Sequence, residues 1–166
     1  KANEILEECK NELDEIGQLF DRNIKVGIMV ETPSTAIIAY KFAKEVDFFS
    51  IGTNDLTQYF LAVDRGNEMV SALYNSFNPA VLEAIQKVID AAHNAGISVS
   101  MCGEFAGDKK ATKLLLGMGL DSFSMSASST LQVKKIIRSS SYAEAQKYRD
   151  IILQQDTPAE VLEKLL

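Results

Sequence analysis

Five polar residues of this 166-residue sequence have the types and positions that chemistry requires, because each stands at or beyond the end of an apolar segment. They are Glu31, Asn54, Asp55, Arg65 and Cys102. The two carboxylates, Glu31 and Asp55, follow neighbouring apolar segments and could converge on one hard cation. Mg²⁺ suits such a pair, since it commonly takes one or two carboxylates and fills its octahedron with water and phosphate oxygens. The alternative is that each carboxylate caps a nearby helix or turn.

Asn54 and Arg65 are candidates for holding an anion. Asn54 follows a Gly-Thr turn, where its amide and exposed backbone N–H groups could hold a phosphate or carboxylate oxygen. Arg65 lies within a Val-Asp-Arg-Gly-Asn stretch, and its guanidinium could bind phosphate oxygens bidentately and neutralise charge in a transfer step. The alternative for Arg65 is a surface ion pair with Asp64 or Glu68.

Cys102 ends an apolar segment and precedes Gly103, which lets a ligand approach closely. A thiol in an ordinary environment is mostly protonated at neutral pH, so this one could donate a proton as well as act as a nucleophile. No histidine nearby in the sequence supports a protease-like pair. The alternative is an inert buried cysteine. Cys9 is expected in the core, and the single histidine, His93, is expected to be structural or solvated because it falls inside a helix.

The segments that carry these residues alternate between apolar strands and amphipathic helices. A leading amphipathic helix is predicted over residues 3–20. Strands are predicted at residues 25–31, 47–52, 97–102 and 121–125, and the continuous apolar run of the first is typical of a strand buried on both faces. Helices are predicted at residues 33–44, 78–96, 108–117 and 130–138, with a polar loop before the second of them. Two capping boxes, Ser141 with Glu144 and Thr157 with Glu160, predict two terminal helices.

This alternation predicts an α/β fold with parallel strands, either an open doubly wound sheet or part of a closed barrel. Polar residues at the strand ends favour the barrel, because the active sites of α/β barrels collect there, and the first strand lacks the Gly-rich phosphate turn of nucleotide-binding sheets. A (β/α)8 TIM barrel needs eight strands and about 250 residues, so four units predict half of one. We expect residues 1–166 to form a single partial domain, with a leading helix over about 1–23, four strand–helix units over 24–138 and C-terminal helices over 139–166.

Composition excludes several classes of function. Seventeen basic and 23 acidic residues leave a net charge of -6, and no basic run interleaves with aromatic residues, so nucleic-acid binding is not expected. The longest apolar runs fall far short of the roughly 20 residues that span a bilayer, so no membrane insertion is expected. The sequence opens without a secretory leader pattern, and its two cysteines lie in unrelated contexts. A cytoplasmic location is therefore predicted.

Five sequence stretches together resemble one family. They are Val26-Gly-Ile-Met-Val-Glu-Thr-Pro33, Phe48-Phe-Ser-Ile-Gly-Thr-Asn-Asp-Leu-Thr-Gln58, Ala62-Val-Asp-Arg-Gly-Asn67, Met101-Cys-Gly-Glu104 and Leu116-Gly-Met-Gly-Leu-Asp121. In combination they are similar to the phosphoenolpyruvate-utilising barrel of the Enzyme I family of the bacterial sugar phosphotransferase system. The resemblance runs from about residue 24 to residue 137, is weaker in the terminal helices, and implies the C-terminal half of that TIM barrel.

The resemblance also implies roles for the candidate residues. Glu31 and Asp55 would be Mg²⁺ ligands, Asn54 and Arg65 would hold the phosphoryl group of phosphoenolpyruvate, and Cys102 would protonate the enolate of pyruvate. In the family, phosphoryl passes to a histidine of the enzyme's own N-terminal domain and then to the histidine-containing phosphocarrier protein. The acceptor histidine and the first half of the barrel are missing from this sequence, so the resemblance implies that the fragment alone is inactive.

Two alternative functions remain. Pyruvate phosphate dikinase and phosphoenolpyruvate synthase share the barrel, although the Ala62 to Asn67 stretch, followed by Leu73-Tyr-Asn-Ser-Phe-Asn-Pro79, favours Enzyme I. A half barrel that serves only as a non-catalytic dimerisation module belongs to a different class. The barrel of the family mediates dimerisation, and four parallel strands leave open sheet edges, so a homodimer is expected.

Overall fold

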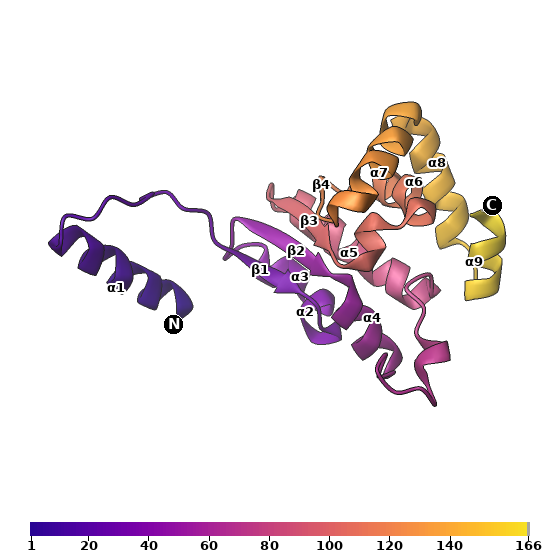
Figure 1. Ribbon diagram of the computed structural model, residues 1–166, viewed down its shortest axis with the longest axis horizontal. Coiled ribbons are helices and arrows are strands. Elements are labelled where there is room, and N and C mark those ends of the chain that lie inside the picture. Colours follow the sequence, from indigo (N-terminus) through magenta and orange to yellow (C-terminus); the bar gives the residue numbers. More distant parts are fainter. Residues whose placement is uncertain (166) are drawn as a thin grey trace.

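The computed structural model describes residues 1–165, and its centre is a parallel sheet of four strands in the order β1-β2-β3-β4 (Figure 1). The strands are β1 (Gly27–Val30), β2 (Phe48–Gly52), β3 (Ser98–Cys102) and β4 (Ser122–Phe123). All four predicted strands are therefore present, and the prediction of an α/β fold with parallel pairing is confirmed. The last strand is shorter than predicted, since only two of its residues pair with β3.

Helices connect the strands and follow the last one. They are α1 (Ala2–Glu15), α2 (Pro33–Ile37), α3 (Ala39–Phe42), α4 (Thr53–Leu61), α5 (Pro79–Asn94), α6 (Lys109–Met118), α7 (Ala127–Ser139), α8 (Tyr142–Leu153) and α9 (Pro158–Lys164), with short 3-10 turns η1 (Ser71–Leu73) and η2 (Glu104–Gly107). None of the helices within residues 1–165 is long and apolar enough to cross a membrane.

One face of the sheet is covered and the other is open. The side chains of Val30, Phe49, Ile51, Val99 and Met101 are fully buried and join the core with apolar residues of α2, α3, α5 and α6. Because successive side chains of a strand point to opposite faces, the register pairs place Met29, Ser50, Ser100 and Cys102 together on the other face.

The open face corrects the prediction that the first strand is buried on both sides. Met29 is 43% exposed, and Val30 is the only fully buried residue of β1. Helices α2, α3, α5 and α6 supply the core on the opposite face, which holds the fully buried strand residues.

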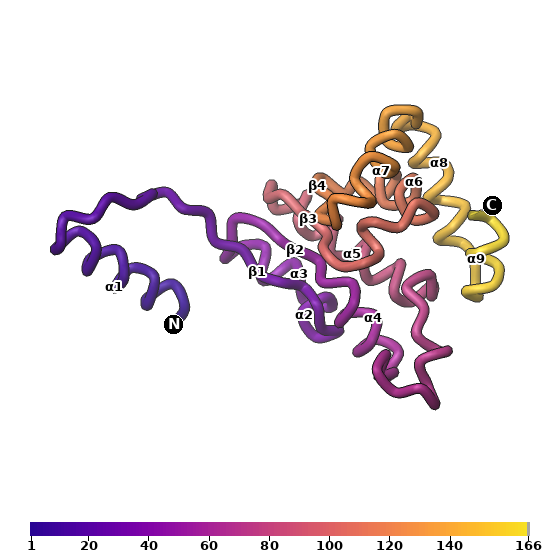
Figure 2. Tube along the Cα trace, in the orientation of Figure 1, coloured from indigo at the N-terminus to yellow at the C-terminus, as the bar shows by residue number. Residues whose placement is uncertain are grey.

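The leading helix stands apart from this core. Figures 1 and 2 show α1 at the far end of the molecule, joined to β1 by a long extended segment. It ends at Glu15 rather than near residue 20, because Gly17 adopts a φ of 70° and the chain turns, with the N–H of Gln18 bonded to the carbonyl of Leu13. No residue of α1 is buried, so the expectation that Cys9 is a core residue is wrong.

Three other expectations about helices need correction. The helix predicted over residues 33–44 is interrupted at Ile38, which separates α2 from α3. The polar loop predicted after β2 begins with a nine-residue helix, α4. The capping box at Thr157 is complete, whereas Ser141 precedes α8 without a side-chain capping bond.

Candidate substrate site at the carboxyl edge of the sheet

The strand-to-helix junctions gather four of the five candidate residues at one edge of the sheet. Glu31 directly follows β1, Asn54 and Asp55 lie in the first turn of α4 just after β2, and Cys102 is the last residue of β3. Parallel strands end at the same edge, so these junctions are neighbours. The fifth residue, Arg65, is brought to this edge by the segment that follows α4.

Glu31 lies against the end of the neighbouring strand. A Cβ atom added to Gly52 would come within 2.8 Å of Oε2 of Glu31, so the glycine makes room for this carboxylate beside β2. The capping alternative does not apply to Glu31, because Thr32 supplies the side-chain oxygen that caps α2. The carboxylate of Glu31 therefore remains at the edge of the sheet. It lies beside Gly52, which precedes Asn54 by two residues.

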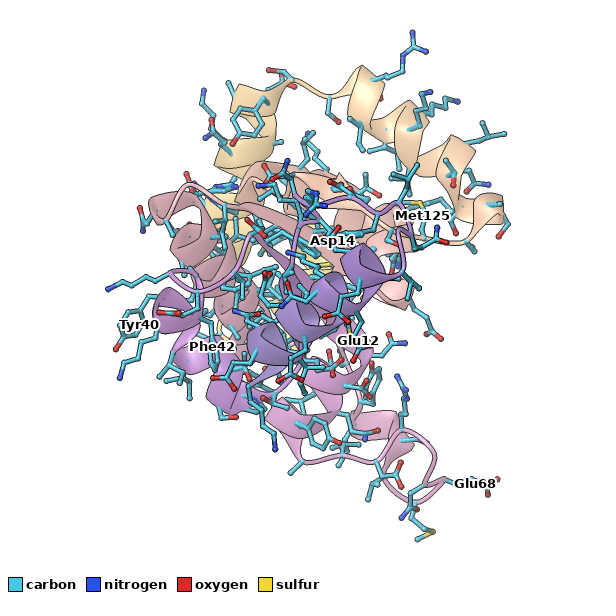
Figure 3. The ribbon with its side chains drawn as sticks, turned by 90° about the vertical axis from the view of Figure 1, so that its left-hand side faces the viewer. Glu12, Asp14, Tyr40, Phe42, Glu68 and Met125 are labelled. Atoms are coloured by element: carbon cyan, nitrogen blue, oxygen red, sulfur yellow. The ribbon has the colours of Figure 1, made fainter. Side chains whose placement is uncertain are left out.

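Asp55 pairs with Arg65. Their Oδ1 and Nη2 atoms are 3.6 Å apart, and both side chains are nearly half exposed. Arg65 therefore does not form the surface pair with Asp64 or Glu68 that was the alternative: the carboxylate of Asp64 accepts a hydrogen bond from the N–H of Gly66. Glu68 points away from the rest of the molecule (Figure 3).

The segment that presents Arg65 is tied to α4. Helix α4 ends at Leu61 and is followed by Ala62, a non-glycine residue with a φ of 52°. The N–H of Arg65 then donates to Oε1 of Gln58 at 3.2 Å, one turn back on the helix. The backbone of Arg65 is thus fixed to α4, and its guanidinium reaches back to the helix's first turn.

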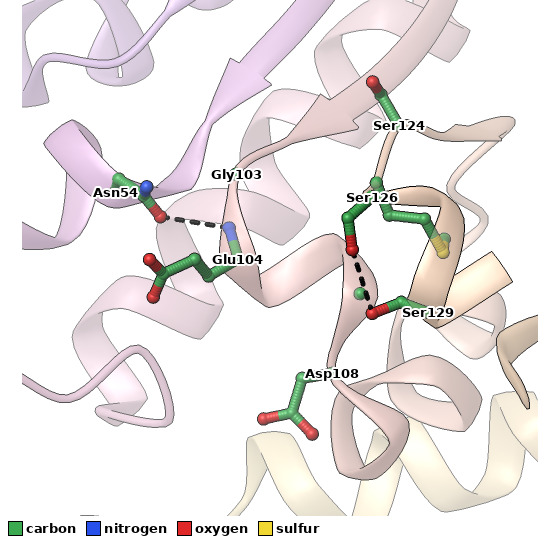
Figure 4. A pocket seen from close by; sticks show the side chains of 9 residues that line it. Asn54, Gly103, Glu104, Asp108, Ser124, Ser126 and Ser129 are labelled. Atoms are coloured by element: carbon green, nitrogen blue, oxygen red, sulfur yellow. Dashed lines mark hydrogen bonds between the residues drawn. The ribbon is translucent and has the colours of Figure 1, made fainter.

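The side-chain amide of Asn54 already accepts one hydrogen bond through its oxygen. The N–H of Glu104 donates to Oδ1 of Asn54 at 3.1 Å, so the oxygen must face the backbone donor and the NH₂ group remains for another partner (Figure 4). The hydroxyl of Tyr74 donates to the backbone carbonyl of Asn54 at 3.1 Å and holds the residue from the other side. This arrangement makes the Asn54 side chain a donor toward the site.

Cys102 is partly buried and has two weak polar contacts. Its Sγ lies 3.6 Å from the hydroxyl of Ser50 and 3.6 Å from the carbonyl oxygen of Ile51. The carbonyl can accept a hydrogen bond from the S–H group. His93 is remote from this edge: its Nε2 is 3.1 Å from Oδ2 of Asp121, just before β4, in agreement with a structural role.

A pocket of about 480 Å³ opens beside Asn54, between the ends of β3 and β4 (Figure 4). Six polar side chains, two glycines and one methionine line it: Asn54, Gly103, Glu104, Gly107, Asp108, Ser124, Met125, Ser126 and Ser129. Asn54 is the only one of the five candidate residues that lines it. The sequence signal for this pocket was the polar end of the last strand; Glu104, Asp108 and Ser129 were not identified as site residues.

The carboxylates of Glu31 and Asp55 suit a hard cation that takes its other ligands from water and substrate rather than from the protein. Among residues 1–165 no group of three or more His, Cys, Asp and Glu side chains gathers closely enough to hold a metal ion. Mg²⁺ needs only one or two carboxylates when substrate oxygens and water complete its shell. Glu31 and Asp55 are compatible with that requirement.

Comparison with known proteins identifies the class to which this fold and edge belong. Residues 1–142 match the family described as "PEP-utilising enzyme, PEP-binding domain", in which PEP is phosphoenolpyruvate. The chain belongs to this family.

Similar proteins carry a more particular name. The chain is 60% identical over 157 residues to the phosphoenolpyruvate-protein phosphotransferase of Haemophilus influenzae, covering 95% of this chain and 27% of that protein. It is 54% identical over 162 residues to the protein of the same name from Bacillus subtilis, covering 98% and 28%. The chain therefore spans about a quarter of the length of the curated relatives it matches.

Proposed function

We propose that this chain is the magnesium- and PEP-binding part of a phosphoenolpyruvate-protein phosphotransferase. The observation that carries the proposal is the meeting of Glu31, Asn54, Asp55 and Cys102 at one sheet edge in a chain of the PEP-binding family. The relatives of that name, at 54–60% identity, support this activity over that of a dikinase or synthase barrel. A cytoplasmic location belongs to the same proposal.

The proposed roles follow from the chemistry of each group. The NH₂ group of Asn54 and the guanidinium of Arg65 donate to oxygens of the transferred phosphoryl group. Glu31 and Asp55 hold Mg²⁺, which neutralises negative charge on those oxygens when it is bound. For this, Arg65 must exchange its pairing with Asp55, an exposed contact at 3.6 Å that costs little to break, about 0–1 kcal/mol.

In the proposed reaction the bond between phosphorus and the enol oxygen of PEP breaks, and phosphoryl passes to the imidazole of a histidine. The bonding electrons remain on the enol oxygen and give the enolate of pyruvate. The S–H of Cys102 donates its proton to the methylene carbon, which yields pyruvate and leaves a thiolate that regains a proton from solvent. Positioning and charge neutralisation supply most of the reduction in barrier.

We also propose the domain to which the sheet belongs: residues 1–166 are a single partial domain, the second half of a TIM barrel. The open face of the sheet supports this, because the interior of a barrel is filled only when all eight strands are present. The partly exposed Met29 and Ser50 would then become interior residues.

The proposed phosphoryl acceptors interact with the whole protein, of which this chain is a part. The acceptor histidine belongs to an N-terminal domain, and the histidine-containing phosphocarrier protein receives phosphoryl from it. The chain alone is therefore expected to be inactive in transfer. We also propose that two copies associate through the open edges of β1 and β4, and a monomeric mass in light scattering at high concentration would contradict that part.

Calorimetric titration with PEP, with and without Mg²⁺, tests the site. The wild-type chain should bind PEP in a metal-dependent manner, and Asp55→Ala should weaken binding more than about tenfold. Glu83→Ala, which removes an exposed carboxylate on α5, is the matched control and should bind normally. Equal binding by Asp55→Ala and wild type would overturn the proposed metal site.

A further inference from the structure

Two strand-to-helix junctions meet at the carboxyl edge of the sheet, and Thr53 links them. The β2–α4 junction carries Asn54 and Asp55, and the β3–η2 junction begins at Cys102. The hydroxyl of Thr53 donates a hydrogen bond to the backbone carbonyl of Cys102, with 3.0 Å between the oxygens. We propose that Thr53 is a positioning residue, which fixes the proton donor relative to the phosphoryl and metal ligands. This inference rests on the proposed function.

The burial of Thr53 limits its hydroxyl to partners within the protein. The described residues include three buried polar side chains, Thr53, Thr57 and Thr112, each with no exposed area. Thr112 bonds to the carbonyl of Asp108, the residue that caps its own helix, and Thr57 bonds to the hydroxyl of Ser76. Thr53 alone among the three bonds to the strand that ends in Cys102. A buried hydroxyl must find a partner, and here the partner is the backbone of the proton donor.

Gly103 brings the two junctions into direct contact. It has a φ of 98° and a ψ of 179°, a conformation that is essentially restricted to glycine. A Cβ atom at this position would lie 2.7 Å from Oγ1 of Thr53 and 2.9 Å from Oδ1 of Asn54. The next residue, Glu104, then donates its N–H to that Asn54 oxygen. Two hydrogen bonds and one tight contact therefore join residues 53–54 to residues 102–104.

The proposed reaction explains why such a link matters. The phosphorus and the methylene carbon of PEP are separated by a fixed P–O–C–C chain. The groups that hold phosphoryl lie on one junction, and the thiol that protonates the carbon lies on the other. Productive binding requires both ends to be in place at once, and small misplacements of reacting groups reduce rates strongly. Thr53 keeps the separation of the two junctions constant without touching the substrate.

The test compares Thr53→Val, Thr53→Ser and Thr57→Val in a Cys9→Ser background, which leaves Cys102 as the only thiol. Valine removes the hydroxyl and keeps the shape, whereas serine keeps the hydroxyl. Thr57→Val is the matched control, because it also removes a buried, bonded hydroxyl of α4, but that hydroxyl bonds to Ser76 rather than to Cys102. Thermal unfolding first establishes that each variant folds.

The first measurement is the rate at which iodoacetamide alkylates Cys102. Losing one hydrogen bond should loosen the end of β3, so Thr53→Val should react about fivefold faster than the parent, while Thr53→Ser and Thr57→Val react at the parental rate. Alkylation of Thr53→Val at the parental rate, or equal acceleration by Thr57→Val, would overturn the proposal.

The second measurement is protection of Cys102 from alkylation by PEP with Mg²⁺. Thr53→Val should need about fivefold more PEP than the parent for the same protection, because its two junctions no longer hold both ends of the ligand. If the parent itself shows no protection, the proposed function of the isolated chain fails. The alkylation rates without ligand still decide whether Thr53 positions Cys102.

Discussion

The two faces of the sheet differ in what their side chains do. The helix-covered face carries five strand residues with no exposed area, and their apolar side chains belong to the continuous core. The open face carries Met29, Phe48, Ser50, Ser100 and Cys102, all of which are at least partly exposed. We infer that one face holds the fold together and that the other, with the carboxyl edge, serves binding and assembly. Substitutions that separate stability from ligand binding test this division.

The largest effect is expected at Phe49 on the covered face. Phe49→Ala should lower the free energy of unfolding by about 3–5 kcal/mol, because it removes a fully buried aromatic ring and leaves a cavity. Its neighbour Phe48 points to the opposite face and is only partly buried, so Phe48→Ala should cost about 1–2 kcal/mol. Urea denaturation measures both. Equal losses would contradict the difference between the faces.

A smaller loss of stability, but a loss of binding, is expected at the carboxyl edge. Gly103→Ala should cost about 2–3 kcal/mol through backbone strain and contact with Thr53, and it should abolish measurable PEP binding in calorimetry. Gly17→Ala is the control, because Gly17 also has a positive φ but no atom lies within 4 Å of its added Cβ. Gly17→Ala should cost about 1 kcal/mol and leave binding unchanged. Normal binding by folded Gly103→Ala would argue against a site at this edge.

Very little loss of stability is expected on the open face of β1. Met29→Gln should change the free energy of unfolding by less than about 0.5 kcal/mol, because the side chain is 43% exposed. Val30→Ala, one residue further and fully buried, should cost about 2 kcal/mol. Thermal unfolding of the two variants gives the comparison. A large loss in Met29→Gln would show that the open face is already covered, for example by a second copy.

The smallest effect concerns the amino edge of the sheet and depends on pH. The backbone N–H of Val26 donates to the carboxylate of Asp47 and, with a smaller contribution from Lys25, lowers the pKa of Asp47. The stabilisation is therefore complete above the usual carboxyl pKa of about 3.9 and is lost as the pH falls through the lower pKa of the folded state. Asp47→Asn should flatten the acid limb of a plot of melting temperature against pH. An unchanged acid limb would contradict this assignment.

The sequence predicted the strands and the edge well, because both depend on local patterns. Apolar runs placed the four strands to within a few residues, and parallel pairing then required Glu31, Asn54 and Cys102 to lie at one edge. The cap at Thr157 was equally predictable, since its partner is three residues away.

The features that the sequence did not predict depend on contacts between distant segments. Helix α4 begins with polar residues that are also frequent in loops, and its formation is supported by buried Leu56 and Thr57. Cys9 has the spacing of a core residue, but no residue of α1 is buried. The pairing of Arg65 with Asp55 depends on how the chain turns back at Ala62, which no spacing of apolar residues encodes.

The fixed amide of Asn54 has a consequence for the design of inhibitors. Because its oxygen already accepts from the N–H of Glu104, the NH₂ group is the unpaired part of this side chain, and a compound placed here gains a bond by presenting an acceptor. A carboxylate, phosphonate or sulfonyl oxygen meets that demand, whereas an ammonium or amide N–H in the same position would face another donor. A fragment library for this pocket can be sorted by that single criterion before any compound is made.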